Sequence, residues 1–104
     1  MQPSFTPGPW TLLPEEADKD YLRIRGTRLG GRYKVANVHH IRYKGVHAVV
    51  RERDDAESMA NARLIAAAPD LLAALELIAN TGMDARQCML TARAAIAKAT
   101  GDTK

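Results

Sequence analysis

Residues 60–76 read ANARLIAAAPDLLAALE. Alanine and leucine are strong helix formers, but Pro69 lacks the amide donor that a helix interior requires. Proline is tolerated in the first turn of a helix, and Asp70 behind it suits the positive end of the helix dipole. The segment therefore predicts two consecutive helices that meet at Pro69.

The first of these helices is expected over residues 56–68, after an N-cap at Asp54 or Asp55. Its apolar residues cover most of the circumference of a helical wheel, which predicts packing on several sides. The second helix should end at Thr81-Gly82. Its expected apolar stripe is Leu71, Leu72, Leu75, Ile78 and Ala79.

A third helix is predicted from Asp84, whose side chain is an N-cap, with Gln87 three residues later as in a capping box. From Gly101 onward we expect a frayed tail. The expected apolar face of this helix comprises Ala85, Cys88, Met89, Ala92, Ala95, Ile96 and Ala99.

Upstream of the helices, the pattern changes to that of short strands. Residues 10–13 form an apolar run closed by Pro14, and residues 21–25 alternate, with Leu22 and Ile24 on one side and Tyr21, Arg23 and Arg25 on the other. Gly30-Gly31 suits a hairpin loop within residues 26–32, and a return strand is expected from Tyr33 to about Ile41. Residues 42–53 are expected to be a loop with a short strand.

These patterns predict an α+β fold: a short antiparallel β-sheet of about three strands, followed by and packed against two to three α-helices. The length of 104 residues suits a single domain over 1–104. Within it we expect an extended lead-in at 1–9, a sheet region at 10–53, a helical region at 54–100 and a tail at 101–104.

Composition limits the cellular environment. No apolar run reaches the roughly 18 residues that a membrane helix needs, and the N-terminus lacks the features of a secretory signal. The single cysteine, Cys88, cannot form an internal disulfide and is expected to be a buried structural residue on the third helix. A cytoplasmic protein without a membrane partner is therefore expected.

Charge is distributed unevenly along the chain. Residues 1–53 hold ten Lys or Arg and five Asp or Glu, a net +5, whereas residues 54–104 hold five and seven, a net −2. An acidic partner for the first half is one interpretation, and an ordinary solvated surface is the other. Basic side chains interleaved with tyrosines mark the predicted hairpin face as the candidate partner-binding surface: Tyr21, Arg23, Arg25, Arg28, Arg32, Lys34, Arg42, Tyr43 and Lys44.

No catalytic signature is present, so an enzyme is not expected, and no cofactor is implied. His39, His40, His47 and Cys88 match no metal-site spacing, and adjacent histidines on a strand point to opposite faces. A metal site is therefore not expected.

Two leucines lie off the predicted stripes of the second and third helices, Leu77 and Leu90, and Arg86 and Arg93 flank Leu90 at helical spacing. These four residues are candidates for self-association, as in a homodimer. The alternative is that each helix packs on two sides.

Residues 60–76, together with the Gly8-Pro9-Trp10 start, resemble a family of small hypothetical proteins of bacteriophages and prophages. In that family a β-hairpin region precedes a helix pair marked "N-A-R-L-I-A-A-A-P-x-L-L". The resemblance covers roughly residues 7–78 and implies no active residues, because the motif consists of packing and capping residues. It does not extend to residues 40–53 or the third helix.

Because small phage accessory proteins of this type are often counter-defence factors, the resemblance implies a cytoplasmic protein of the infected bacterial host. The leading hypothesis is that the protein binds a host defence complex stoichiometrically and occludes it. The specific form of this hypothesis is an anti-CRISPR that acts on a CRISPR effector. Two alternatives remain: a nucleic-acid-binding protein that uses the same basic face, and an oligomeric sponge for a nucleotide signal.

Overall fold

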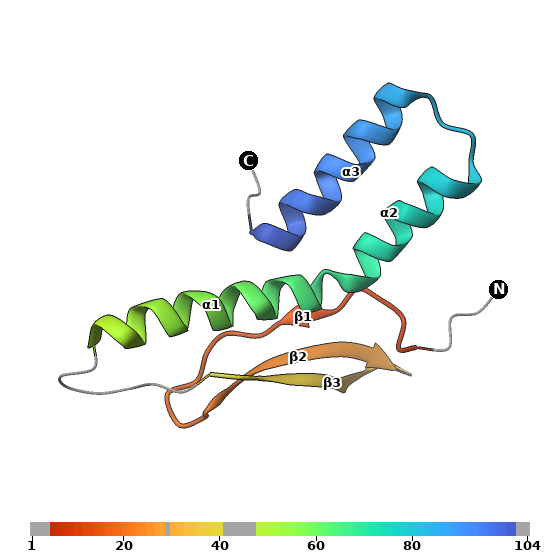
Figure 1. The fold of residues 1–104 in the computed structure, drawn as a ribbon. Coiled ribbons are helices and arrows are strands. Elements are labelled where there is room, and N and C mark those ends of the chain that lie inside the picture. Colours follow the sequence, from red (N-terminus) through yellow and green to blue (C-terminus); the bar gives the residue numbers. More distant parts are fainter. Residues whose placement is uncertain (1–4, 29, 41–47, 102–104) are drawn as a thin grey trace.

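A computed structural model describes residues 5–28, 30–40 and 48–101, except for the side chains of residues 48–54. The strands β1 (Thr11–Leu12), β2 (Tyr21–Arg28) and β3 (Gly31–His39) precede the helices α1 (Ala48–Ala66), α2 (Ala68–Asn80) and α3 (Ala85–Thr100). Figure 1 shows α1 lying across the sheet, while α2 and α3 leave it together as a helical hairpin. The predicted α+β class, with an antiparallel sheet followed by helices, is confirmed.

The three strands form an antiparallel sheet in the order β1-β2-β3. Leu22, Ile24 and Gly26 on β2 are buried, and the residues between them are half-buried. The alternation predicted for residues 21–25 is therefore confirmed, with its apolar side facing the interior. β1 comprises Thr11 and Leu12 and is shorter than predicted, although the Leu13 amide still donates to the Arg23 carbonyl on β2 at 2.9 Å.

The hairpin loop predicted over residues 26–32 is wrong in its length. β2 continues to Arg28, and β3 begins at Gly31, after Gly30 with a positive φ of 81°. Gly26 lies inside the strand, where a Cβ would come within 3.0 Å of Thr6 Cγ2 and 3.4 Å of Trp10 Cδ1. This glycine permits the close approach of the lead-in segment rather than a turn.

The first helix begins earlier than predicted. α1 starts at Ala48, so the short strand expected within residues 42–53 is wrong for the described part, and Asp54 and Asp55 lie inside the helix rather than at its N-cap. Valines favour strands only weakly, and the range 48–66 contains no glycine or proline to stop helix elongation. Residues 42–47 lie outside the described part.

Packing of α1 on several sides, predicted from its apolar circumference, is confirmed in part: α1 contacts the three strands and also α2 and α3. Ala62 and Ala66 are buried, whereas Leu64 and Ile65 on the same helix are exposed. Small alanines let the helix backbone approach the sheet closely, and the larger side chains lie on the side without a covering layer.

The buried core is small. Among the residues whose side chains the structure describes, its apolar members are Leu22, Ile24, Ala62, Ala66, Ala67 and Ala99. The largest fully buried side chains are Leu22, Ile24 and His40, so β2 supplies the main bulk and the helices supply mostly alanine. Such a core supports one sheet–helix layer and leaves much apolar helix surface outside it.

The break between the first two helices is confirmed. α1 ends at Ala66 and α2 begins at Ala68, with Pro69 in its first turn. Because proline cannot donate to the preceding turn, the chain changes direction here. Gly8 lies directly against this break: a Cβ on Gly8 would be 2.7 Å from Pro69 Cβ.

α2 ends at Asn80 and α3 begins at Ala85, as predicted from Thr81-Gly82 and Asp84. The Asp84 carboxylate accepts a hydrogen bond of 2.9 Å from the Gln87 amide, which confirms the N-cap. Gly101, expected to open a frayed tail, instead caps α3 in the left-handed conformation with φ 78°.

The predicted apolar stripes of α2 and α3 are only partly buried in the protein interior. Leu71, Ile78 and Cys88 are half-buried, and the Cys88 thiol lies 3.7 Å from the Met83 carbonyl. Large members of both stripes are exposed instead: Leu72, Leu75, Met89 and Ile96. A two-helix hairpin can bury only the side where its helices meet, so stripes wider than that contact remain in solvent.

We expect Gly8→Ala to lower the free energy of unfolding by about 1–3 kcal/mol, because the new methyl group would collide with the rigid Pro69 ring. The measurement is urea unfolding followed by circular dichroism.

Gly31→Ala is the matched control. A Cβ there meets nothing closer than 3.7 Å, the distance to the Arg28 carbonyl oxygen. Equal unfolding midpoints for the two variants would contradict the proposed contact between the lead-in and the helix break.

Candidate binding surface

The outer face of the sheet carries the side chains predicted to bind a partner. Tyr21, Arg23 and Arg25 on β2 alternate with buried residues and therefore lie on the side away from α1. Pairing brings Lys34 on β3 opposite Arg25, and Arg32 opposite Thr27. The sequence-based expectation of a shared outer face holds for these positions, but their environments differ.

At one end of this face, the positive charge is neutralised by residues 15–19, the acidic turn that precedes β2. Arg23 forms an ion pair with Glu16, and Lys19 Nζ lies 3.3 Å from a Glu16 carboxylate oxygen and 3.8 Å from Asp18. The hydrogen bond with Glu16 and the nearby charge of Asp18 raise the pKa of Lys19 above its ordinary value of 10.5. Little net positive charge remains at this end for a partner.

Arg25 is engaged by the sheet itself. The register shifts between Ile24 and Arg25, where β3 holds one extra residue. Nη1 of Arg25 donates to the carbonyl oxygens of Ile24 and Ala36, at 3.0 and 3.1 Å, and to Asn37 Oδ1 at 3.1 Å. The guanidinium thus satisfies acceptors left by the bulge, which is a structural role.

Uncommitted positive charge gathers at the turn end of the β2–β3 hairpin. We call Arg28, Arg32, Tyr33 and Lys34 the tip cluster; all four residues are exposed. The Arg28 guanidinium lies 5.0 Å from the centroid of the Tyr33 ring, within cation–π range. Among the residues that the structure describes, no carboxylate forms an ion pair with Arg28, Arg32 or Lys34.

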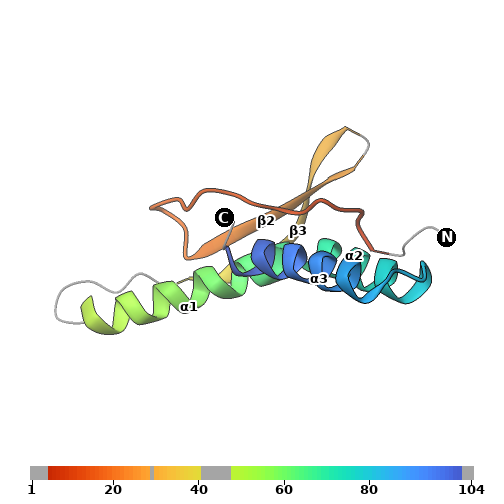
Figure 2. The ribbon, with the colours of Figure 1, turned by 90° about the horizontal axis from the view of Figure 1, so that it is seen from above.

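The tip cluster is accessible because of where the hairpin ends. Figure 2 shows the end of β2 and the start of β3 extending away from all three helices. A partner can therefore approach these side chains from several directions. Arg42, Tyr43 and Lys44, which were also predicted to bind, lie outside the described residues, as does His47.

A buried histidine was not recognised from the sequence as a functional or structural centre. His40 is 1% exposed, and its Nε2 lies 2.9 Å from Glu15 Oε1 and 3.9 Å from Asp55 Oδ1. His39 beside it is exposed, as adjacent strand residues should be. The period-two pattern through Ala36 and Val38 was the signal that places His40 on the inner side.

His40 connects the acidic turn to α1, and its backbone amide donates to the Asp20 carbonyl at 2.9 Å. This arrangement anchors the end of β3. Within the described ranges, no three His, Cys, Asp or Glu side chains form a group that could hold a metal ion.

The four residues predicted to mediate self-association are exposed but do not form one patch. Leu77 on α2 lies seven residues after Asp70 and therefore shares its helix face. Leu90, Arg86 and Arg93 lie on α3, where Arg93 is five residues, or about 140°, from Lys98. Asp70 and Lys98 form an ion pair of 2.8 Å, so they mark the same face of the hairpin. Leu77 lies on that face, whereas the three candidate residues of α3 point in other directions.

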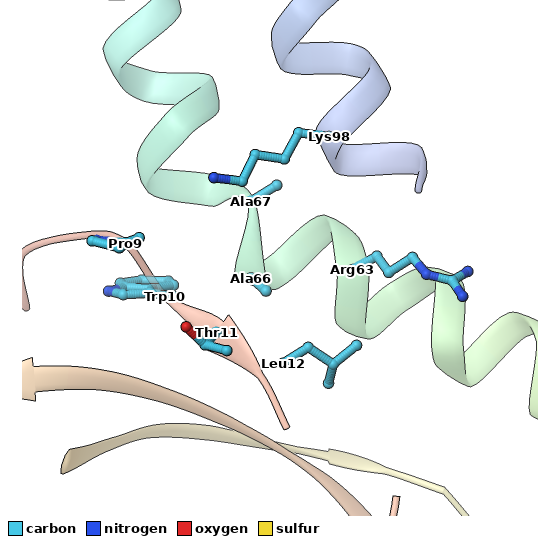
Figure 3. A pocket seen from close by; sticks show the side chains of 8 residues that line it. All are labelled: Pro9, Trp10, Thr11, Leu12, Arg63, Ala66, Ala67 and Lys98. Atoms are coloured by element: carbon cyan, nitrogen blue, oxygen red, sulfur yellow. The ribbon is translucent and has the colours of Figure 1, made fainter. Parts of the chain in front are cut away.

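A shallow pocket of about 310 Å³ lies where the lead-in segment meets the helix break. Figure 3 shows Pro9, Trp10, Thr11 and Leu12 on one side and Arg63, Ala66, Ala67 and Lys98 on the other. The Gly8-Pro9-Trp10 start and the alanine run therefore meet in space.

The contacts of this pocket indicate packing more than ligand binding. The Trp10 indole donates to the Thr6 carbonyl at 2.9 Å, and Phe5 packs edge-on against the ring. Of the two cations, Lys98 is already paired with Asp70. Among the described residues that line the pocket, Arg63 is therefore the one cation available to bind a small anionic ligand.

The sequence of the chain matches one known family. The family model of Salmonella phage P22 protein Y8K6 matches residues 1–103. The chain belongs to the Y8K6 family. The match covers nearly the whole sequence, including the stretch 40–53 and the third helix, which lay outside the resemblance seen from the motifs alone.

No curated protein and no solved structure gives a significant match to this Y8K6 family member. Among the residues with described structure, no helix combines the length and apolar content that crossing a bilayer demands.

We expect Arg25→Ala to lower the free energy of unfolding by about 1–2 kcal/mol, because carbonyl oxygens at the bulge lose a charged donor. Arg32→Ala is the control, since an exposed side chain without described partners should change stability by less than about 0.5 kcal/mol. Denaturant titration of both variants measures the difference. If Arg25→Ala proved as stable as Arg32→Ala, its guanidinium would be free to bind, contrary to the assigned structural role.

Proposed function

We propose that this Y8K6 family member is a stoichiometric binding protein of the phage that covers an acidic surface on a host defence complex. An anti-CRISPR acting on a CRISPR effector is the concrete version. The observation that supports this proposal is the tip cluster at a projecting end of the molecule: Arg28 lies against the Tyr33 ring, and Arg32 and Lys34 are the neighbours of Tyr33 on β3. Among the described residues, none of these three cations has a carboxylate partner.

The chemistry of the tip cluster suits a protein interface. Arginine and tyrosine are enriched at such interfaces because they combine a large contact area with a polar group. Arg28 lies against the Tyr33 ring and is thereby partly held in place, which reduces the side-chain entropy lost on binding. Complementary charge would also speed association with an acidic partner.

The same face is less suited to nucleic acid. A protein that follows a phosphate backbone needs a continuous basic track with open aromatic rings for stacking. Here the basic track is interrupted where Glu16 and Asp18 neutralise Arg23 and Lys19. One side of the Tyr33 ring is also occupied by Arg28.

The proposal is tested by affinity capture of the tagged protein from host lysate, with and without nuclease, read by mass spectrometry. Two double variants with equal charge change are compared: Arg28→Gln with Arg32→Gln, and Lys19→Gln with Arg23→Gln. We expect a nuclease-resistant, stoichiometric complex whose Kd rises at least about tenfold in the first variant. The second variant should bind as the unmodified protein does, because its cations are already paired.

Three results would contradict the proposal. Recovery of many unrelated proteins that is lost on nuclease treatment would indicate nucleic-acid binding instead. Equal affinities for the two double variants would show that the tip cluster is not the contact surface. A bait without a partner, which instead co-purifies with a nucleotide, would favour the nucleotide sponge.

A further inference from the structure

The α2–α3 hairpin has a large uncovered apolar surface. Nine of the thirteen residues of α2 are alanine, leucine or isoleucine, yet none of them is buried. On α3 only Ala99 is buried. Figure 1 shows the reason: the hairpin leaves the sheet, so neither the sheet nor α1 lies over most of it. Helices that are apolar over so much of their surface are usually covered by another layer.

The ion pair between Asp70 and Lys98 identifies one face of the hairpin, at the end next to the pocket of Figure 3. Successive residues of a helix are 100° apart. Leu72 and Leu75 are therefore about 200° and 140° from Asp70, and Ile96 is about 200° from Lys98. These leucines and the isoleucine lie on the opposite face of the hairpin.

Met89 is nine residues before Lys98 and lies on that opposite face as well. We call Leu72, Leu75, Met89 and Ile96 the apolar face. Its members are exposed, from 40% for Leu72 to 63% for Leu75. Leu72 and Leu75 lie on α2, and Met89 and Ile96 lie on the antiparallel helix α3. Together they form two adjacent apolar stripes on the side of the hairpin that faces away from the lead-in segment.

The same ion pair also shows which residues of α2 and α3 lie side by side along the axis of the hairpin. Because Asp70 and Lys98 are in contact and both helices rise 1.5 Å per residue, Leu72 lies about level with Ile96. By the same count, Glu76 lies about level with Ala92 and Arg93.

The two rims of the apolar face carry opposite charge. Glu76 is two residues, or about 200°, from Ala74, which is half-buried towards α3, so Glu76 lies on the outer rim of α2. Arg93 is likewise about 200° from half-buried Ala95 and lies on the outer rim of α3. The charged residues of α2 are all acidic, Asp70 and Glu76, and those of α3 are all basic, Arg86, Arg93 and Lys98.

We propose that a second copy of this chain covers the apolar face, with α2 of each copy packed antiparallel against α3 of its partner. A two-fold axis parallel to the helices places the acidic rim of one copy on the basic rim of the other, with Glu76 level with the partner's Arg93. The other possible two-fold axis lies in the plane of the interface and is perpendicular to the helices. Rotation about that axis would instead bring Glu76 of one copy against Glu76 of the other. The charge pattern thus selects one of the two face-to-face dimers.

The product is an antiparallel four-helix bundle in which Leu72 of one copy meets Ile96 of the other. The self-association surface predicted from Leu77 and Leu90 is not the one used, because Leu77 lies on the ion-pair face. The dimer does not depend on the proposed function, although it would present two tip clusters to a partner.

The oligomeric state of the full chain is tested by sedimentation velocity over a dilution series. We expect a concentration-dependent dimer whose dissociation constant rises at least about tenfold in Leu75→Glu. Leu77→Glu, a substitution at a 46% exposed leucine on the opposite face of the same helix, should leave it unchanged. A monomer at every concentration, or equal effects of the two substitutions, would overturn the proposal.

Charge reversal tests the arrangement within the dimer. Glu76→Arg and Arg93→Glu should each weaken association, whereas the double variant should restore it. About the other two-fold axis like charges face each other in every one of these variants, so neither single substitution would weaken association selectively and the double variant would restore nothing. That result would overturn the assigned geometry. Circular dichroism spectra of all variants verify that these exposed substitutions leave the helices intact.

Discussion

The missing amide of Pro69 determines how the rest of the molecule is arranged. Because proline cannot donate to the preceding turn, a long alanine- and leucine-rich segment divides into α1, which lies on the sheet, and α2, which leaves it. Gly8 and the lead-in pack against this break. The change of direction gives α1 a buried alanine side on β2 and gives the α2–α3 hairpin a surface that its own chain does not cover.

The positive charge of the first half is shaped by intramolecular partners more than by the number of cations. Glu16 pairs with Arg23 and Lys19, and the bulge engages Arg25, so the outer face is neither uniformly basic nor uniformly available. Among the described residues of this half, the positive charge that remains unpaired is concentrated at the turn end of the hairpin. This distribution favours a compact contact over an extended one, as the proposed binding to a protein requires.

Much of the fold could be predicted from the sequence because its signals are local. Alternation at Leu22 and Ile24, the break at Pro69 and the cap at Asp84 depend on neighbouring residues only. The wrong predictions concern residues whose environment is set by distant parts of the chain. Gly26 lies within β2, where its missing Cβ leaves room for Thr6 and Trp10 of the lead-in segment. α1 begins at Ala48 despite the strand preference of the valines. For the binding surface, the outer face was predictable, but its neutralisation by Glu16 was not, because ion pairs between a turn and a strand leave no periodic signal.

The break at Pro69 leaves the α2–α3 hairpin uncovered, and its opposite charged rims fit a second copy of the chain over the apolar face. The most direct measurement is an isotope-filtered NOE experiment on a mixture of ¹³C-labelled and unlabelled chains, which detects only contacts between copies. We expect intermolecular NOEs between the methyl groups of Leu72 and Ile96. Methyl contacts within single chains only, or intermolecular contacts at Leu77 instead, would contradict the proposed dimer.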